Sequence, residues 1–130
     1  MRQCKVLVVD DETDFLDSLV RRLCRRGLEA VGVTSGEAAL ERLPREPFDV
    51  VVLDVKMPGM DGIEVLRRLK EKGIQVEVIL LTGHASVESG VDGVELGAFD
   101  YLIKPVKLDD LMERIRDADE RGQLVRKTAP

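Results

Sequence analysis

Four side chains suited to phosphate chemistry stand directly behind short apolar runs of this 130-residue chain: Asp10, Asp11, Asp54 and Lys104. The apolar runs before them cover residues 6–9, 50–53 and 101–103. Such runs indicate buried parallel strands, and open parallel sheets bind ligands beyond the carboxyl ends of their strands. The spacing therefore predicts that three acids and one lysine meet at a single edge of a sheet.

Clustered carboxylates need a cation or a shifted pKa, because two of them about 4 Å apart repel by about 4 kcal/mol at an effective dielectric of about 20. Carboxylates, a backbone carbonyl and waters suit Mg²⁺. With the other acids neutralised, an oxygen of Asp54 can act as a nucleophile toward phosphorus. Lys104 would hold the phosphoryl oxygens. Thr82 ends a further apolar run and would donate its hydroxyl, with Gly83 leaving room beside it.

Patterns typical of strands and helices alternate along the whole chain. Expected strands cover residues 5–9, 29–33, 50–53, 76–81 and 99–103, and helical spacing of apolar residues follows each of them. The helix expected at 86–96 is the weakest, because each interior glycine costs about 1 kcal/mol relative to alanine. Five such units predict an α/β, flavodoxin-like fold, a doubly wound five-stranded parallel sheet in the order 2-1-3-4-5 with five flanking helices.

Length and composition indicate one domain, expected at residues 1–121, with a polar tail or linker stub at 122–130. The formal net charge of -5 argues against direct contact with nucleic acid. Cys4 and Cys24 form no spaced metal or disulfide framework. No leader and no membrane span is evident, so we expect a soluble, cytoplasmic protein.

The acids, the threonine and the lysine lie within motifs that resemble the receiver domains of two-component response regulators, of the CheY-like superfamily. These motifs are DDE at 10–12, DVKMPGMDG at 54–62, LTG at 81–83 and GAFDYLIKP at 97–105. The resemblance spans about residues 4–121. It implies that Asp54 accepts a phosphoryl group from the phosphohistidine of a histidine kinase in a Mg²⁺-dependent reaction.

The resemblance also implies the metal ligands: Asp11, Asp54 and the backbone carbonyl of Lys56 would bind Mg²⁺ directly, and Asp10 would bind it through water. The protein would catalyse its own phosphotransfer and a slow hydrolysis of the phosphoaspartate, and is best described as a signalling switch.

Further residues of the motifs carry implied roles around the phosphoryl group. Thr82, Gly83 and Lys104 would bind that group. Tyr101 would turn inward when Thr82 moves. Pro105 would follow a cis peptide bond, which only an X-Pro bond makes readily accessible. Implied partners are a sensor histidine kinase or phosphotransfer protein, a downstream target or a missing output domain, and a second copy bound through the fourth helix, fifth strand and fifth helix.

Three other functions compete with phosphotransfer as interpretations of these residues. A flavin binder would need a Ser/Thr/Gly-rich loop where this chain has two aspartates and a glutamate, which repel an unmetallated phosphate. A phosphatase with an aspartyl nucleophile on the first strand would place a second aspartate where Glu12 stands. A receiver-like interaction module that is never phosphorylated stays open as the main alternative. His84, the single histidine, is expected to be solvated rather than catalytic.

Overall fold

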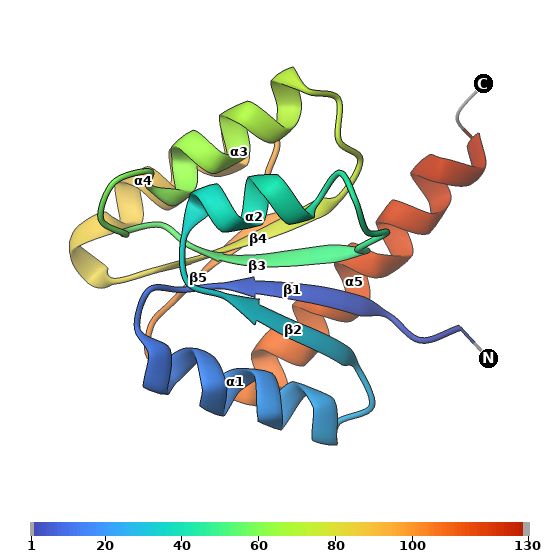
Figure 1. Ribbon diagram of the computed structural model, residues 1–130, viewed down its shortest axis with the longest axis horizontal. Coiled ribbons are helices and arrows are strands. Elements are labelled where there is room, and N and C mark those ends of the chain that lie inside the picture. Colours follow the sequence, from blue (N-terminus) through green and yellow to red (C-terminus); the bar gives the residue numbers. More distant parts are fainter. Residues whose placement is uncertain (1, 129–130) are drawn as a thin grey trace.

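Five parallel strands form one sheet in the order β2-β1-β3-β4-β5 in the computed structural model, which describes residues 2–128 (Figure 1). The strands are β1 Lys5–Val9, β2 Glu29–Val33, β3 Val50–Asp54, β4 Glu77–Thr82 and β5 Asp100–Ile103. The helices are α1 Thr13–Arg25, α2 Gly36–Arg42, α3 Gly62–Glu71, α4 Val87–Glu95 and α5 Leu108–Thr128, with a short 3-10 turn at His84–Ser86. The predicted fold class and strand order are confirmed.

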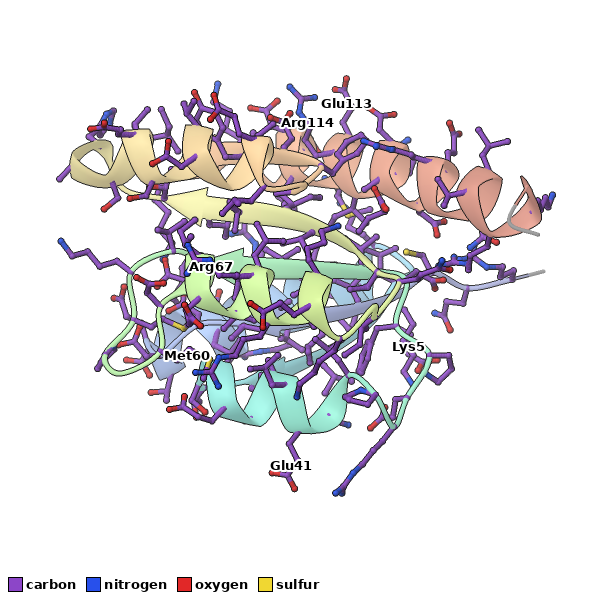
Figure 2. The ribbon with its side chains drawn as sticks, turned by 90° about the horizontal axis from the view of Figure 1, so that it is seen from above. Lys5, Glu41, Met60, Arg67, Glu113 and Arg114 are labelled. Atoms are coloured by element: carbon purple, nitrogen blue, oxygen red, sulfur yellow. The ribbon has the colours of Figure 1, made fainter. Side chains whose placement is uncertain are left out.

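The sheet lies between two layers of helices, α1 and α5 on one face and α2, α3 and α4 on the other (Figure 1). Because side chains alternate along a strand, Leu7 and Val51 pack toward α2 and α3, while Val8 and Val52 pack toward α1 and α5. All five residues of β3 are buried. Polar side chains such as Glu41 and Glu113 project outward from their helices (Figure 2). The central strands are thus covered on both faces, which fixes where their ends point.

Local signals define most helix ends. The Ser35 side chain accepts a hydrogen bond from the backbone N–H of Ala38 at 3.1 Å, as expected for a residue that caps α2. The Asp61 carboxylate accepts one from the N–H of Glu64 at 2.9 Å and caps α3. Gly73 follows α3 with φ of 67°, the left-handed conformation that glycine adopts without strain. The two N-terminal caps thus define where α2 and α3 begin, at the carboxyl edge of the sheet, and Gly73 marks the end of α3 at the other edge.

Helix α4 forms despite its glycines because they let it approach the sheet closely. A Cβ on Gly93 would lie 2.2 Å from Leu80 Cδ1, and one on Gly90 would lie 3.1 Å from the ring of Tyr101. The larger apolar side chains of this helix lie on the other side, with Val91 41% and Val94 37% exposed. Tertiary packing therefore replaces intrinsic helix propensity in this segment.

Helix α5 continues through the segment that we expected to be a polar tail. Residues 122–128 are helical, and Arg126 pairs with Asp49 at 3.1 Å beside the amino end of β3. Leu111 and Ile115 are fully buried, as their spacing predicts. The domain limit at residue 121 stays a prediction, and residues 129 and 130 lie outside the described part of the chain. Within residues 2–128, neither α5 nor any other helix is long and apolar enough to cross a membrane.

Candidate functional site

The acids of β1 and β3 meet because the two strands are neighbours in register. Val9 pairs with Leu53, so Asp10 and Asp54, which follow them, lie side by side at the edge of the sheet. Carboxylate oxygens of Asp10, Asp11 and Asp54 all lie within 4.8 Å of one another. Asp10 is 1% and Asp54 6% exposed. The structure thus brings together three acids that lie up to 44 positions apart in the sequence.

Lys104 reaches this acidic cluster from the end of β5. Its Nζ lies 2.9 Å from Asp10 Oδ2 and 3.4 Å from Asp54 Oδ1. Its backbone N–H donates to the Thr82 carbonyl at 2.8 Å, and the Lys104–Pro105 peptide bond is cis, the conformation that the family resemblance implies. The lysine therefore spans β4 and contacts acids from both central strands.

The charges of the site perturb one another. Burial, reinforced by the negative charge of Asp10, raises the pKa of Asp54 to about 6 against the opposing attraction of Lys104. Burial alone would lower the pKa of Lys104, but the hydrogen bond with Asp10 and the charge of Asp54 outweigh it, so its pKa is raised. Three acids facing one lysine leave an excess of negative charge. An additional cation would relieve it.

The donor set fits a hard divalent ion. Its members are carboxylates, and Asp11 at the open side of the cluster is the most exposed of the three. Both oxygens of Asp10 are engaged, since Oδ1 accepts from the Glu12 N–H at 2.9 Å and Oδ2 accepts from Lys104. Oxygen ligands of this kind suit Mg²⁺ rather than zinc.

The other predicted residues surround the cluster at different depths. Thr82 is 1% exposed, and its hydroxyl donates to the Gly83 carbonyl at 3.2 Å rather than to an acid. The side-chain position of Gly83 opens into space, with no atom within 4 Å. Lys56 and His84 are exposed, and Tyr101 is half-buried. The end of β4, which pairs with β3 beside Asp54, thus supplies the buried hydroxyl of Thr82 and the open space at Gly83.

Two residues at the site are not among those predicted from the sequence to act there. A Cβ on Gly62 would lie 2.4 Å from the carbonyl oxygen of Asp54, so α3 begins directly against the backbone of that aspartate. The ring of Phe15 lies 4.5 Å from Lys104 Nζ, although its spacing indicated only a core residue of the first helix. Gly62 belongs to the quoted DVKMPGMDG motif, whereas no local pattern relates Phe15 to a lysine 89 positions away.

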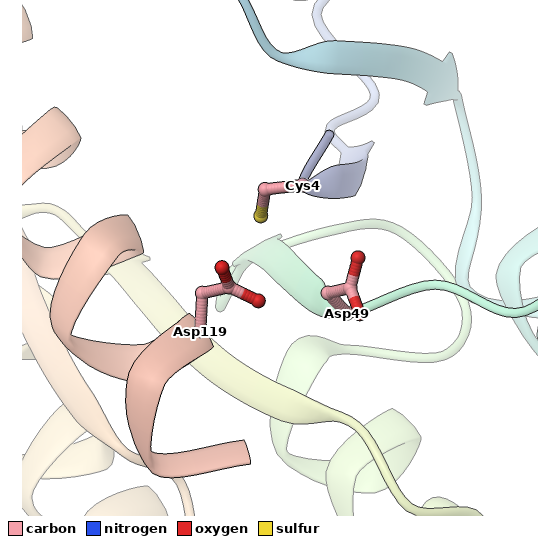
Figure 3. A group of neighbouring side chains, drawn as sticks. All are labelled: Cys4, Asp49 and Asp119. Carbon is pink, nitrogen blue, oxygen red and sulfur yellow. The ribbon is translucent and has the colours of Figure 1, made fainter. Parts of the chain in front are cut away.

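A second cluster lies at the opposite edge of the sheet, where Cys4, Asp49 and Asp119 face one another (Figure 3). Its acids are already paired: Arg2 lies 2.7 Å from Asp49 and 2.6 Å from Asp119. Burial, with the nearby negative charges, raises the pKa of the Cys4 thiol to about 12, so the thiolate that a metal needs is disfavoured. This cluster is an ionic network that joins the chain start to α5, not a metal centre.

Comparison with known proteins gives one family. A family model described as response regulator receiver domain matches residues 6–116. Response regulator MprA of Mycobacterium leprae is 40% identical over 126 residues, which are 97% of this chain and 53% of MprA. Transcriptional regulatory protein TcrA of Mycobacterium tuberculosis is 38% identical over 122 residues, which are 94% of this chain and 48% of TcrA. The chain spans about half the length of these curated relatives.

Solved structures agree with this assignment. The crystal structure of a response regulator receiver domain protein from Clostridium thermocellum matches with a TM-score of 0.89 and 35% identity, covering 94% of this chain and 98% of that one. Its fold and the sequence relatives point to the same signalling class. The chain therefore belongs to the response regulator receiver domain family and fits two-component phosphorelay signalling.

Proposed function

We propose that Asp54 is the phosphoacceptor of this receiver domain and takes its phosphoryl group from the phosphohistidine of a sensor histidine kinase or phosphotransfer protein. The observation that carries the proposal is the position of Asp54, buried at a strand end with Lys104 Nζ 3.4 Å from one of its oxygens and two further acids beside it. In the transfer, an oxygen of Asp54 forms a bond to phosphorus while the bond from phosphorus to the histidine nitrogen breaks. The imidazole leaves with the electron pair of that bond.

Asp11, Asp54 and the backbone carbonyl of Lys56 would hold Mg²⁺ directly, with Asp10 acting through water. The bound ion would offset the charge of the acids and of the incoming phosphoryl oxygens. This assignment agrees with Asp10 having both oxygens engaged, while Asp11 lies at the open side.

Lys104, Thr82 and Gly83 would bind the phosphoryl group. The ammonium of Lys104 would pair with one phosphoryl oxygen, and the Thr82 hydroxyl would exchange its 3.2 Å bond with the Gly83 carbonyl for a bond to another. The open side-chain position of Gly83 leaves space for that oxygen. Charge-assisted hydrogen bonds of this kind contribute about 1.5 to 3 kcal/mol each.

Movement of Thr82 would let Tyr101 turn inward, which would convert phosphorylation into a change of the α4–β5–α5 face. The ring of Tyr101 borders Gly90 of α4, so its rotation would be felt by that helix. A complete reversal of a 1:99 equilibrium needs about 5.5 kcal/mol, so the resting protein would keep a small active population. Tyr101 is the single tyrosine of a chain without tryptophan, so tyrosine fluorescence reports this residue alone.

The α4–β5–α5 face would bind the next component: a downstream protein, an output domain or a second copy of the chain. Its apolar contributors include Val94 at 37% and Ile103 at 36% exposed. Arg114 already pairs with Asp100 at 2.8 Å within one molecule, and Glu113 and Arg114 project from this side of α5 (Figure 2). TcrA, named a transcriptional regulatory protein, suggests an output domain in a longer chain. We place the protein in the cytoplasm, where the family typically acts.

Incubation with Mg²⁺ and acetyl phosphate, followed by intact mass measurement, tests the acceptor. The parent should gain one phosphoryl group, and Asp54→Asn should gain none. Asp49→Asn is the matched control, because it changes a carboxylate at the opposite edge of the sheet and should still be phosphorylated. If the folded, metal-loaded parent gains no phosphoryl group, the alternative of an interaction module that is never phosphorylated would be favoured. The family match does not favour that alternative.

A further inference from the structure

Phe15 lies in the first helical turn after the acid pair, and the Nζ of Lys104 sits 4.5 Å from the centre of its ring. We propose that Phe15 is a positioning residue for phosphotransfer, which holds the Lys104 ammonium over its ring and directs it toward Asp54. The inference rests on the proposed function, because it gives Phe15 a part in the reaction through Lys104.

Lys104 needs such a constraint because its ammonium, although it pairs with Asp10 and Asp54, lies at the end of a flexible side chain. Its N–H bonds the Thr82 carbonyl at 2.8 Å, but its four-carbon side chain is flexible. The ammonium has a third carboxylate within reach, Glu12 at 4.0 Å, whose side chain is 71% exposed. Pairing with Glu12 alone would draw the lysine toward solvent. A ring beside the ammonium restricts this motion, since the face of an aromatic ring attracts a cation within about 6 Å.

The ring itself is held by the core. Phe15 is half-buried and packs against the cluster that α1 and α5 share with the sheet. It also borders a cavity of about 60 Å³ between those helices, together with Leu19, Leu81 and Leu111. One side of the ring is therefore anchored among apolar groups, and the cation lies at its face. Because leucine is smaller than phenylalanine, Phe15→Leu would enlarge this cavity at some cost in stability, so its folding is checked before its rate is compared.

The chain carries three phenylalanines, and each has a cation over its ring. Phe48 lies 5.0 Å from Lys5 Nζ, and Phe99 lies 5.8 Å from the guanidinium carbon of Arg121. Phe15 makes the shortest of these contacts, and its cation is the one that lies at the acidic cluster. Phe99 begins the β5 segment and offers the same chemistry away from the site, which makes it a matched control.

A cation held by a ring can also move without losing its partner. Attraction to the ring face has no fixed hydrogen-bond direction, so the ammonium can pass from Asp10 toward a phosphoryl group on Asp54 while it stays over Phe15. A directional hydrogen bond, such as the one to Asp10, must instead be broken when the ammonium moves. The ring therefore limits exposure to solvent while allowing the displacement that phosphotransfer requires.

Phosphorylation rates of Phe15→Leu, Phe15→Tyr and Phe99→Leu test the proposal, each measured with subsaturating acetyl phosphate at one Mg²⁺ concentration. Loss of a cation–π contact worth about 0.5 to 1 kcal/mol corresponds to a rate lowered about twofold to fivefold in Phe15→Leu. Phe15→Tyr keeps a ring and should recover the rate, and Phe99→Leu should match the parent. Equal rates for Phe15→Leu and Phe99→Leu, or no recovery with tyrosine, would overturn the inference.

The proton NMR shift of the Lys104 ε-methylene reports directly whether the ring of Phe15 lies against the lysine. A role of Phe15 in packing alone would not change this shift. Ring currents should shift these protons upfield in the parent and in Phe15→Tyr, and the shift should vanish in Phe15→Leu. An unshifted signal in the parent would overturn the contact. If the parent takes up no phosphoryl group, the proposed function fails, while the NMR signal still decides whether Phe15 holds Lys104. Should Phe15→Leu not fold, Phe15→Met serves both measurements.

Discussion

Replacing the buried acceptor carboxylate by its neutral isostere should stabilise the metal-free protein at neutral pH. In Asp54→Asn an amide takes the place of a carboxylate that is 6% exposed and lies beside Asp10. Burial and the Asp10 charge raise the pKa of Asp54 from 3.8 to about 6. At about 1.4 kcal/mol per pH unit this shift represents about 3 kcal/mol. This net shift already includes the opposing attraction to Lys104, so we expect Asp54→Asn to gain up to about 3 kcal/mol.

The pH dependence has a definite sign. Because the pKa is raised on folding, the folded protein holds the Asp54 proton more tightly than the unfolded chain. The stability that belongs to this group is fully present below about pH 3.8 and is lost as the pH rises to about 6. Asp54→Asn lacks this loss. The free energies of unfolding of the two proteins should thus be similar near pH 4. They should differ most above about pH 6.

Urea denaturation followed by circular dichroism, with EDTA present, measures this difference in the free energy of unfolding. Asp49→Asn is the control for the substitution itself, since Asp49 pairs with Arg2 at 2.7 Å and Arg126 at 3.1 Å and its neutralisation should destabilise. Saturating Mg²⁺ should stabilise the parent more than Asp54→Asn, because the ion binds the folded site. If the free energies of unfolding of the parent and of Asp54→Asn differ by the same amount at every pH, the effect does not come from ionisation of Asp54.

Three further predictions concern glycines and thiols. Gly62→Ala places a Cβ 2.4 Å from a backbone oxygen of β3 and should lower the free energy of unfolding by about 1 to 3 kcal/mol in urea denaturation, a result contradicted by an unchanged midpoint. Gly93→Ala places a Cβ 2.2 Å from a buried leucine and should destabilise the protein, although alanine favours helix. Gly122→Ala places a Cβ 3.3 Å from a flexible glutamate side chain and should stabilise the protein by about 0.5 to 1 kcal/mol. The opposite order of stabilities would show that packing is not decisive. Ellman's reagent should modify the exposed Cys24 first and Cys4, whose pKa is raised to about 12, only on unfolding, and Cys24→Ser should abolish the fast phase.

Much of the fold was predictable because its signals are local. Short apolar runs, followed by helical spacing, indicate the strands and helices, and both faces of a parallel sheet must be covered. The predicted strand bounds differ from the observed ones by no more than one residue; β4, for example, begins at Glu77 instead of Val76. The expected polar tail from residue 122 was wrong as a prediction of secondary structure, because α5 continues to Thr128. Its last turns lack apolar periodicity, and the structure instead places Arg126 beside Asp49.

Local order therefore determined which residues lie at the strand ends: two acids directly after β1, Asp54 at the end of β3, Thr82 at the end of β4 and Lys104 after β5. Because parallel strands share one carboxyl edge, the sequence by itself predicted that these groups converge. Tertiary structure alone decided their contacts, including the 2.9 Å pair of Lys104 with Asp10, the start of α3 against the Asp54 backbone and the ring of Phe15 beside the lysine. The physical reason is that periodicity encodes which face of an element is buried, whereas a contact across about 90 residues depends on how the elements pack.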